Sequence, residues 1–143
     1  MNIFNYQFQI STKGYNDVTD ISPKVFQFIL QSKIGNGFVL VFSPGSTCGI
    51  TSIEYETGAI DDLKYFFEKL IPMSYDYKHN QRWHDGNGFS HIRSAFLKPN
   101  FSFPVIDGKP VLGTWQQVVF VDFDNTERSR NIYVQIIGQQ ENE

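Results

Sequence analysis

Alternating apolar and polar residues open the chain and predict its first strand. Residues 4–10 alternate large apolar side chains with Asn or Gln, which is typical of a strand with one buried face. Residues 38–42 and 48–55 form two further runs of strand length, separated by Pro44 and Gly45. The polar segment 14–20 is predicted as a turn.

Three segments follow the helical period instead. Residues 22–33 begin with Ser22 and Pro23, which suit a helix N-cap and first position. Residues 57–70 place apolar side chains on one helical face, and residues 88–97 form a shorter third helix. The intervening residues 73–88 are predicted as a long polar loop, which in a small domain is more often functional than idle.

The last forty residues read as a meander of strands. Strands are predicted over residues 101–106, 115–123 and 132–137, with a hairpin at Asp107-Gly108. The strand over 115–123 is apolar on both faces, so we expect it to be central and covered on both sides. The polar tail over residues 139–143 is predicted to fray.

Strands mixed with about three helices indicate an α+β protein with mixed or antiparallel sheets. The length of 143 residues fits one domain, which we assign to residues 1–138. The net charge of −3 and the lack of a basic run argue against nucleic-acid or anionic-membrane partners. No signal peptide or membrane-length apolar run is evident, and the lone Cys48 favours a reducing compartment, so a cytoplasmic protein is expected.

The densest group of reactive side chains lies in residues 79–91. All three histidines, His79, His84 and His91, fall within these thirteen residues, together with Asp85. Imidazole and carboxylate groups suit zinc and related divalent metals, although this spacing matches no tight metal motif. The alternative is that these histidines are solvated or cap helices.

A glycine pair marks the start of the third helix. Gly86, Asn87 and Gly88 would let a ligand approach the backbone, and free N–H groups at a helix N-terminus attract anions. Arg93 could add positive charge, but His91 and Arg93 lie about 160° apart on a helical wheel, so they cannot both face one small pocket. The alternative is a simple turn.

Two further segments carry polar side chains beside strands. Glu54 and Glu56 lie two residues apart, so on a strand they face the same side and could ligate a metal or act as acid and base, or simply face solvent. The adjacent amides of Gln116 and Gln117 could bind a ligand or a neighbouring subunit, or make strand-edge hydrogen bonds. Cys48 is interpreted as a small buried hydrophobe rather than a nucleophile.

The runs GSTCGITSIEYETG, WHDGNGFSHIRS, LGTWQQVVFVDFD and YVQIIG occur in this order and cover nearly the whole chain. Together they resemble the YjbQ family, also called secondary thiamine-phosphate synthase-like proteins. The resemblance implies a small α+β fold that assembles as a homotrimer, and a weak thiamine-phosphate synthase activity.

The family motifs map onto Glu54, His84, Asn87 and His91, and onto the segment 113–117. One position departs from the pattern. Many relatives carry a histidine before the Thr-Thr or Ser-Thr pair, where this chain has Gly45. If chemistry needs that histidine, this branch uses another group or does something else.

Two main hypotheses follow. The first is an enzyme site at a subunit boundary, where His84, His91 and Glu54 hold a divalent metal, Mg²⁺ or Zn²⁺, and Asp85 supports them. The residues predicted to bind a small phosphorylated substrate are Gly86, Asn87, Gly88, Arg93, Thr114, Trp115 and Gln116. The second is a non-catalytic trimer that binds a small anion or metabolite. A metal-dependent hydrolase is a third alternative.

Overall fold

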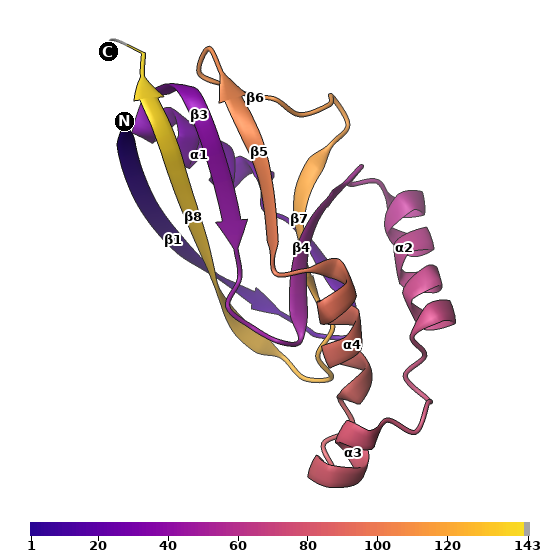
Figure 1. The fold of residues 1–143 in the computed structure, drawn as a ribbon. Helices are drawn as coiled ribbons and strands as arrows, with labels where there is room; N and C mark the ends of the chain where they lie inside the picture. The colour runs from indigo at the N-terminus through magenta and orange to yellow at the C-terminus, as the bar shows by residue number, and fades with distance from the viewer. Residues whose placement is uncertain (142–143) are drawn as a thin grey trace.

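The computed structural model describes residues 1–141 and contains eight strands and four helices (Figure 1). Their bounds are β1 Asn2–Thr12, β2 Asp17–Asp20, α1 Ser22–Ser32, β3 Ile34–Phe42, β4 Cys48–Ile53, α2 Thr57–Leu70, α3 Lys78–Trp83, α4 Gly88–Leu97, β5 Asn100–Ile106, β6 Lys109–Pro110, β7 Gln117–Asp122 and β8 Arg128–Gln140. No helix within residues 1–141 is long and apolar enough to cross a membrane.

The strands form two antiparallel sheets. The larger sheet has the order β1-β8-β3-β5-β6, and the smaller has the order β2-β7-β4. β1 pairs with β8 along its whole length, from Asn2 opposite Gly138 to Thr12 opposite Arg128. The expected α+β class is therefore confirmed, and its sheets are antiparallel.

The main core lies between the two sheets. It is built from inward-facing residues of β3, β5 and β8, from one face of β4 and β7, and from the apolar side of α1. Ser22 fixes α1 to the smaller sheet, because its Oγ accepts the backbone N–H of Val118 at 2.7 Å. Ser22 is the first residue of α1, so the N-cap is Ile21 and not Ser22 as the sequence predicts.

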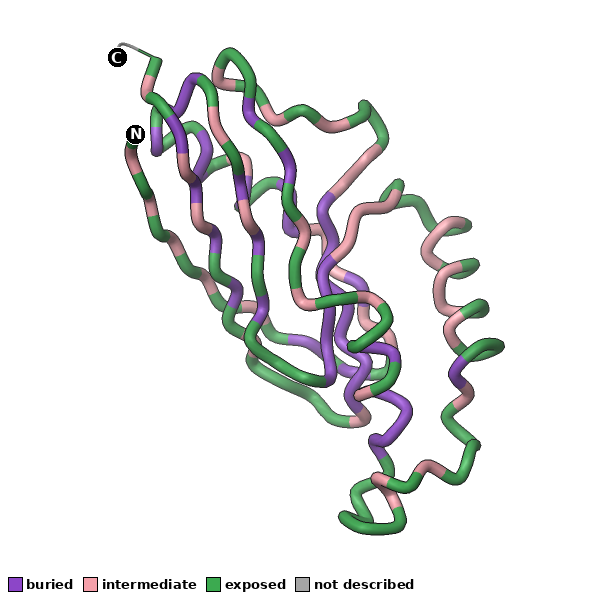
Figure 2. Tube along the Cα trace, viewed as in Figure 1, coloured by how far each residue is buried: buried purple, intermediate pink, exposed green. Residues whose placement is uncertain are grey.

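A second core lies on the other face of the smaller sheet, where α2 and α4 pack. Val119 and Val121 of β7 point to this side, together with Phe123 and Val18. Phe67 of α2 packs edge-on against Phe123, with ring centroids 4.8 Å apart. β7 is consequently buried on both faces, as its unbroken apolar sequence predicts (Figure 2).

The hairpin predicted at Asp107-Gly108 is confirmed. Both residues have positive φ, 50° at Asp107 and 72° at Gly108, as a type I′ turn requires. Glycine suits position 108 because it adopts the left-handed conformation without a steric cost.

Three predictions about elements are wrong. Residues 17–20, predicted as a turn, form β2, because their backbone pairs with β7 even though three of the four side chains are polar. Residues 78–83, predicted as loop, form the short helix α3. Gln139 and Gln140, predicted as frayed, continue β8, and Gln140 Nε2 donates to the carbonyl of Ser32 at 2.9 Å. The N–H of Glu141 donates to the carbonyl of Lys33 at 3.1 Å, and residues 142–143 of that tail lie outside the described residues.

Because Phe120 is fully buried in the central strand of the smaller sheet, Phe120→Ala should lower the free energy of unfolding by about 3–5 kcal/mol. Urea unfolding followed by circular dichroism measures this change. Phe96→Ala is the matched control, since Phe96 is 74% exposed and should lose less than about 1 kcal/mol. Equal losses in the two variants would contradict the described core.

Candidate functional site

Two of the three histidines come together where α3 meets α4. His79 of α3 and His91 of α4 have ring centroids 4.3 Å apart. His84 instead occupies the C-cap of α3 in the left-handed conformation, with φ 59°, and is exposed. The pair of imidazoles is therefore His79 with His91, whereas the sequence analysis selected His84 with His91.

Gly88 allows the two helices to approach so closely. A Cβ atom at this position would lie 2.6 Å from Cβ of Tyr77, which is far inside van der Waals contact. The N–H of Gly88 donates to Asn80 Oδ1 at 2.8 Å, so α3 already occupies the donor that was expected to face an anion. Gly88 thus serves helix packing, and Gly86, with φ 71°, forms the exposed turn before it.

Asp85 lies beside the imidazole pair. Its Oδ1 is 3.3 Å from Nδ1 of His79. Asn125 Nδ2 donates to the backbone carbonyl of Asp85 at 2.8 Å and ties this loop to the turn between β7 and β8. Asp85, predicted to support the set of His84, His91 and Glu54, therefore accompanies His79 in the structure.

Asn87 links this loop to a buried carboxylate. It is only 8% exposed, and its Nδ2 donates to Oδ1 of Asp124 at 3.3 Å. In the opposite orientation of the amide, the nitrogen would lie 2.9 Å from Oδ1 of Asp85. The amide of Asn87 therefore stands between two carboxylates.

Asp124 is fully buried at the end of the smaller sheet and accepts hydrogen bonds from several segments. Thr47 Oγ1 donates at 3.0 Å, Arg128 Nη2 at 2.8 Å and the Asn125 backbone N–H at 2.8 Å. Burial raises the pKa of Asp124, but these bonds and the one from Asn87 outweigh burial and lower the pKa below its usual value. Asp124 is therefore a carboxylate at neutral pH.

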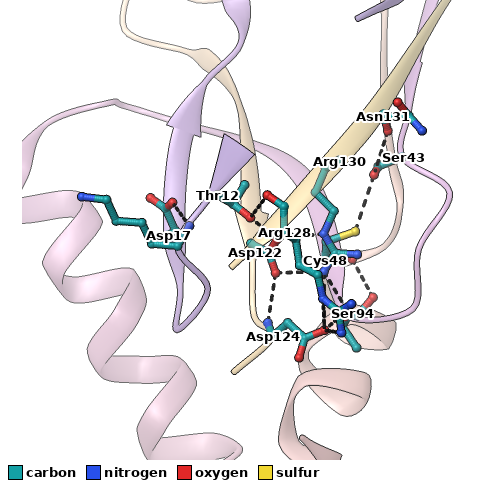
Figure 3. Close-up of polar contacts among 12 residues, drawn as sticks. Thr12, Asp17, Ser43, Cys48, Ser94, Asp122, Asp124, Arg128, Arg130 and Asn131 are labelled. Carbon is teal, nitrogen blue, oxygen red and sulfur yellow. Dashed lines mark hydrogen bonds and ion pairs between the residues drawn. The ribbon is translucent and has the colours of Figure 1, made fainter. Parts of the chain in front are cut away.

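A second buried carboxylate supports the first. Arg130 donates two hydrogen bonds to Asp122, at 2.8 and 2.9 Å (Figure 3). Its Nη2 also donates to Oγ1 of Thr47 at 2.8 Å. Thr12 donates to the same Asp122 at 2.5 Å. Arg128 and Arg130 are thus already engaged by carboxylates.

The environment of His91 favours its neutral form. Burial is the main cause that lowers its pKa, and the neighbouring His79 lowers it further, while Asp124, Asp85 and the backbone carbonyl of Ser46 act in the opposite direction. A neutral imidazole retains one N–H donor and one free lone pair, so it can bind a ligand from either nitrogen.

Arg93 serves the fold and lies away from this cluster. Its fully buried guanidinium donates to the carbonyl of Ile71 at 2.7 and 3.0 Å, to Asn16 Oδ1 at 2.8 Å and to Glu68 at 2.7 Å. Arg93 therefore joins the end of α2 to α4 and to the loop before β2. Its predicted role in ligand binding is not supported by this placement, and its separation from His91 agrees with their opposite sides of the helical wheel.

Glu54 belongs to a different part of the surface. It follows the last residue of β4, whereas Thr47, beside Asp124, precedes the first, so the strand separates them by roughly 20 Å. Glu54 lines an open groove of about 480 Å³ together with Trp115 and Gln117. Within residues 1–141, no group of three or more His, Cys, Asp or Glu side chains is placed to hold a metal ion, so Glu54, His84 and His91 do not form a metal site within one chain.

The amides near this groove make local hydrogen bonds. Gln116 donates to Ser52 Oγ at 3.0 Å and accepts the N–H of Gly113 at 3.0 Å, and Gln117 Oε1 accepts the N–H of Tyr55 at 2.9 Å. These are the strand-edge bonds of the alternative interpretation. Thr114 and Trp115 are exposed beside them, and Trp115 is 70% exposed.

Cys48 is fully buried, and burial raises the pKa of its thiol. Its sulfur lies 3.5 Å from Ser43 Oγ, and a Cβ at Gly45 would come within 2.8 Å of it. A side chain at position 45 would therefore clash with Cys48 in this backbone conformation. Position 45 is the one where many relatives carry a histidine and this chain has glycine.

Sequence reasoning missed Thr47, Asp124 and Asn125 as parts of the site, and noted His79 without selecting it. Residues 124–130 lie between the strands predicted over 115–123 and 132–137 and were given no functional role. One signal was present: Asp122 and Asp124 alternate with apolar residues in the run VDFD, and buried carboxylates require partners.

Comparison with known proteins identifies the family to which this chain is similar. The family model described as "UPF0047 protein YjbQ-like" matches residues 6–139. A UPF0047 protein of Methanocaldococcus jannaschii is 34% identical over 134 residues, which cover 93% of this chain and 94% of that protein. Another, from Methanothermobacter thermautotrophicus, is 32% identical over 97% of this chain and 95% of its own length.

Solved structures agree with these matches. A YbjQ-like protein of unknown function from Sulfolobus solfataricus P2 has a TM-score of 0.87 at 32% identity, covering 96% of this chain and 100% of that one. A YjbQ/UPF0047 protein from Clostridium acetobutylicum has a TM-score of 0.84 at 30% identity, covering 92% and 99%. The similarity therefore spans both the histidine pair and the groove at Glu54.

If Arg93 is structural, Arg93→Met should lower the free energy of unfolding by about 2–4 kcal/mol, because it leaves the carbonyl of Ile71 without its donors. Urea unfolding tests this. Arg82→Met is the control, since Arg82 is exposed on α3. A loss below about 1 kcal/mol in Arg93→Met would contradict the structural role.

Because Cys48 is buried with a raised thiol pKa, the native protein should not react with a disulfide reagent such as DTNB. One thiol per chain should react once urea unfolds the protein, as followed by absorbance. Full reaction of the folded protein within minutes would show an accessible thiol and reopen the interpretation of Cys48 as a nucleophile.

Proposed function

This chain belongs to the YjbQ-like UPF0047 family, and we propose that it is an enzyme with weak thiamine-phosphate synthase activity at the junction of α3 and α4. The observation that carries the proposal is the convergence of two imidazoles, His79 and His91, with ring centroids 4.3 Å apart beside Asp85. The lowered pKa of His91, at a partly exposed position, is the kind of perturbation that clusters at functional sites.

The reaction joins a pyrimidine diphosphate to a thiazole phosphate. The thiazole nitrogen forms a bond to the methylene carbon of the pyrimidine, and the bond from that carbon to the diphosphate breaks, with its electron pair leaving on the diphosphate. The substrate enters as its Mg²⁺ complex, which protein sites typically hold through one or two carboxylates and the phosphates themselves. Asp85 is an exposed carboxylate whose Oδ1 lies 3.3 Å from Nδ1 of His79.

The histidines would then orient the leaving group. A neutral imidazole still has one N–H that can donate to a phosphate oxygen, and such donors stabilise the charge that develops as the diphosphate departs. Arg128 and Arg130 already pair with Asp124 and Asp122, so neither is free to neutralise the diphosphate, which favours a slow reaction.

A direct assay tests the proposal. Purified protein is incubated with the two phosphorylated substrates and Mg²⁺, and thiamine phosphate is detected after oxidation to its fluorescent product. His91→Ala and His79→Ala should each lower the rate at least tenfold. His84→Asn is the matched control, because Asn tolerates the left-handed conformation of this exposed position, and its rate should stay within twofold.

The alternative function is binding without turnover of a small anion or metabolite, and the engagement of both arginines by carboxylates is the observation that favours it over multi-phosphate chemistry. Calorimetry should then detect binding of the pyrimidine diphosphate to the wild-type protein and not to His91→Ala, while no thiamine phosphate is formed. This result would favour the binding function over the enzymatic one. An unchanged rate in both histidine variants would place any activity outside the α3–α4 junction.

The proposal includes assembly as a homotrimer. The outer face of the larger sheet leaves Ile3, Phe38 and Tyr133 exposed, and its edge strand β1 carries no charged side chain to discourage pairing with another chain. Light scattering on the purified protein should give about 50 kDa, three times the chain mass of 16.5 kDa. A mass near that of one chain would contradict the trimer.

A further inference from the structure

Both tryptophans of the chain are exposed, and they lie far apart on the molecule. Trp83 ends α3 and is 62% exposed, whereas Trp115 lines the groove at Glu54 and is 70% exposed. α3 lies near the turn between β7 and β8, and the groove lies at the other end of β4 (Figure 1). Tryptophan is enriched at protein–protein interfaces, where burial of its large ring contributes much of the binding energy. Each end of the chain therefore presents a surface suited to a partner.

The groove carries negative charge. Asp20, Glu54 and Glu56 line it, and no basic side chain does. Asp20 and Glu56 accept backbone N–H groups at 2.9 and 2.7 Å, while the carboxylate of Glu54 has no hydrogen bond or ion pair with any part of the chain that the structure describes. Like charges gathered in a groove attract a surface of opposite charge. The groove thus suits a basic partner that also offers an aromatic ring to Trp115.

α3 has the complementary character. Lys78 and Arg82 are exposed and lie four residues apart, on one face of the helix. Among the four helices of residues 1–141, only α3 combines two exposed basic side chains with no acidic one. Arg82 lies over the ring of the adjacent tryptophan, with Cζ 5.4 Å from the ring centroid. Asp76 and Asp85 flank the helix, but Asp76 accepts a hydrogen bond from α3 itself and Asp85 lies 3.3 Å from His79.

We propose that α3 of one copy of this chain docks in the acidic groove of the next copy. The inference rests on the homotrimer proposed above and names one contact within it. A three-fold ring needs two different surfaces on each chain, because each copy meets its two neighbours through different faces. α3 and the groove are two such surfaces, opposite in charge and too far apart for a chain to fill its own groove.

Docking gives the histidine site a residue from a neighbour. His79 lies on α3 and Glu54 lines the groove, so the contact brings Glu54 of the partner subunit toward the imidazole pair. Glu54 and the histidines, which lie apart within one chain, then meet between two chains. A second carboxylate at this place suits a substrate that enters as its Mg²⁺ complex.

Chemical cross-linking between copies tests the contact. Thr57→Cys places a thiol in the groove and Gln81→Cys places one on α3, at exposed positions that leave the charged side chains intact. A short bismaleimide should join this double variant into covalent trimers on a denaturing gel, because each chain is linked to both neighbours, while the buried Cys48 stays unreacted. Thr57→Cys with Leu30→Cys is the matched control. Leu30 is 75% exposed on α1, so this pair should remain unlinked.

Charge reversal tests the reason for the contact. In the Thr57→Cys/Gln81→Cys protein, Glu54→Lys and Arg82→Glu should each lower the cross-linked fraction about fivefold, because like charges then face each other. Both changes together should restore that fraction to within about twofold. Lys109→Glu, an exposed position on β6, is the control and should leave the fraction unchanged.

The outcomes separate this contact from the trimer itself. A protein that light scattering shows to contain three chains, but that is not cross-linked or is cross-linked only into dimers, overturns the docking of α3 and leaves the trimer standing. The mass of a single chain overturns both. Cross-linking that neither Glu54→Lys nor Arg82→Glu reduces also overturns the proposal, because it stands on their opposite charges. No substrate is present, so these results are independent of the synthase assay.

Discussion

The buried carboxylate of Asp124 is the interaction on which the site depends. It accepts hydrogen bonds from Thr47 before β4, from Asn87 at the start of α4 and from Arg128 in β8. A charge removed from water is tolerated only when it is fully paired, so these three segments are held in fixed relation by the same requirement. The position of His91 on α4 follows from it, since Asn87 immediately precedes α4, and the bond from the N–H of Gly88 to Asn80 then ties α3, with His79, to the same helix. The group that supports the start of α4 is thus a carboxylate from the turn between β7 and β8.

A second consequence concerns the way family motifs are distributed. Glu54 and the segment 113–117 lie at one end of β4, and His91 and Asn87 lie at the other. Residues that occur together in a sequence pattern therefore need not share one site in the chain. Glu54 has its own groove with Trp115, and the α3–α4 junction must be judged on its own contacts.

The sequence predicted those elements whose pattern reflects burial. β7 reads as apolar on both faces because it is covered by a core on each side, and β1 alternates because only one of its faces is buried. The segment 17–20 could not be predicted in this way, because its pairing with β7 is a long-range backbone interaction that leaves no apolar pattern. For the site, the sequence predicted the histidine-rich segment. It could not distinguish His79 from His84, because that choice depends on α3, and the polar sequence of residues 78–83 shows no helical apolar pattern. Gly88 and Arg93 were assigned to a ligand because the sequence does not reveal which neighbouring chain segments fill the same space.

The pairing of β1 with β8 bears on how the chain is made. The two strands are far apart in sequence, with Asn2 opposite Gly138, so β1 leaves the ribosome long before its partner exists. During this interval an uncharged strand with Phe4, Tyr6, Phe8 and Ile10 on one side has no sheet to join. Such a segment can associate with the same segment of another nascent chain. β1 can pair with β8 only late in synthesis. Until then, β1 is the segment of this protein for which binding by a chaperone matters most.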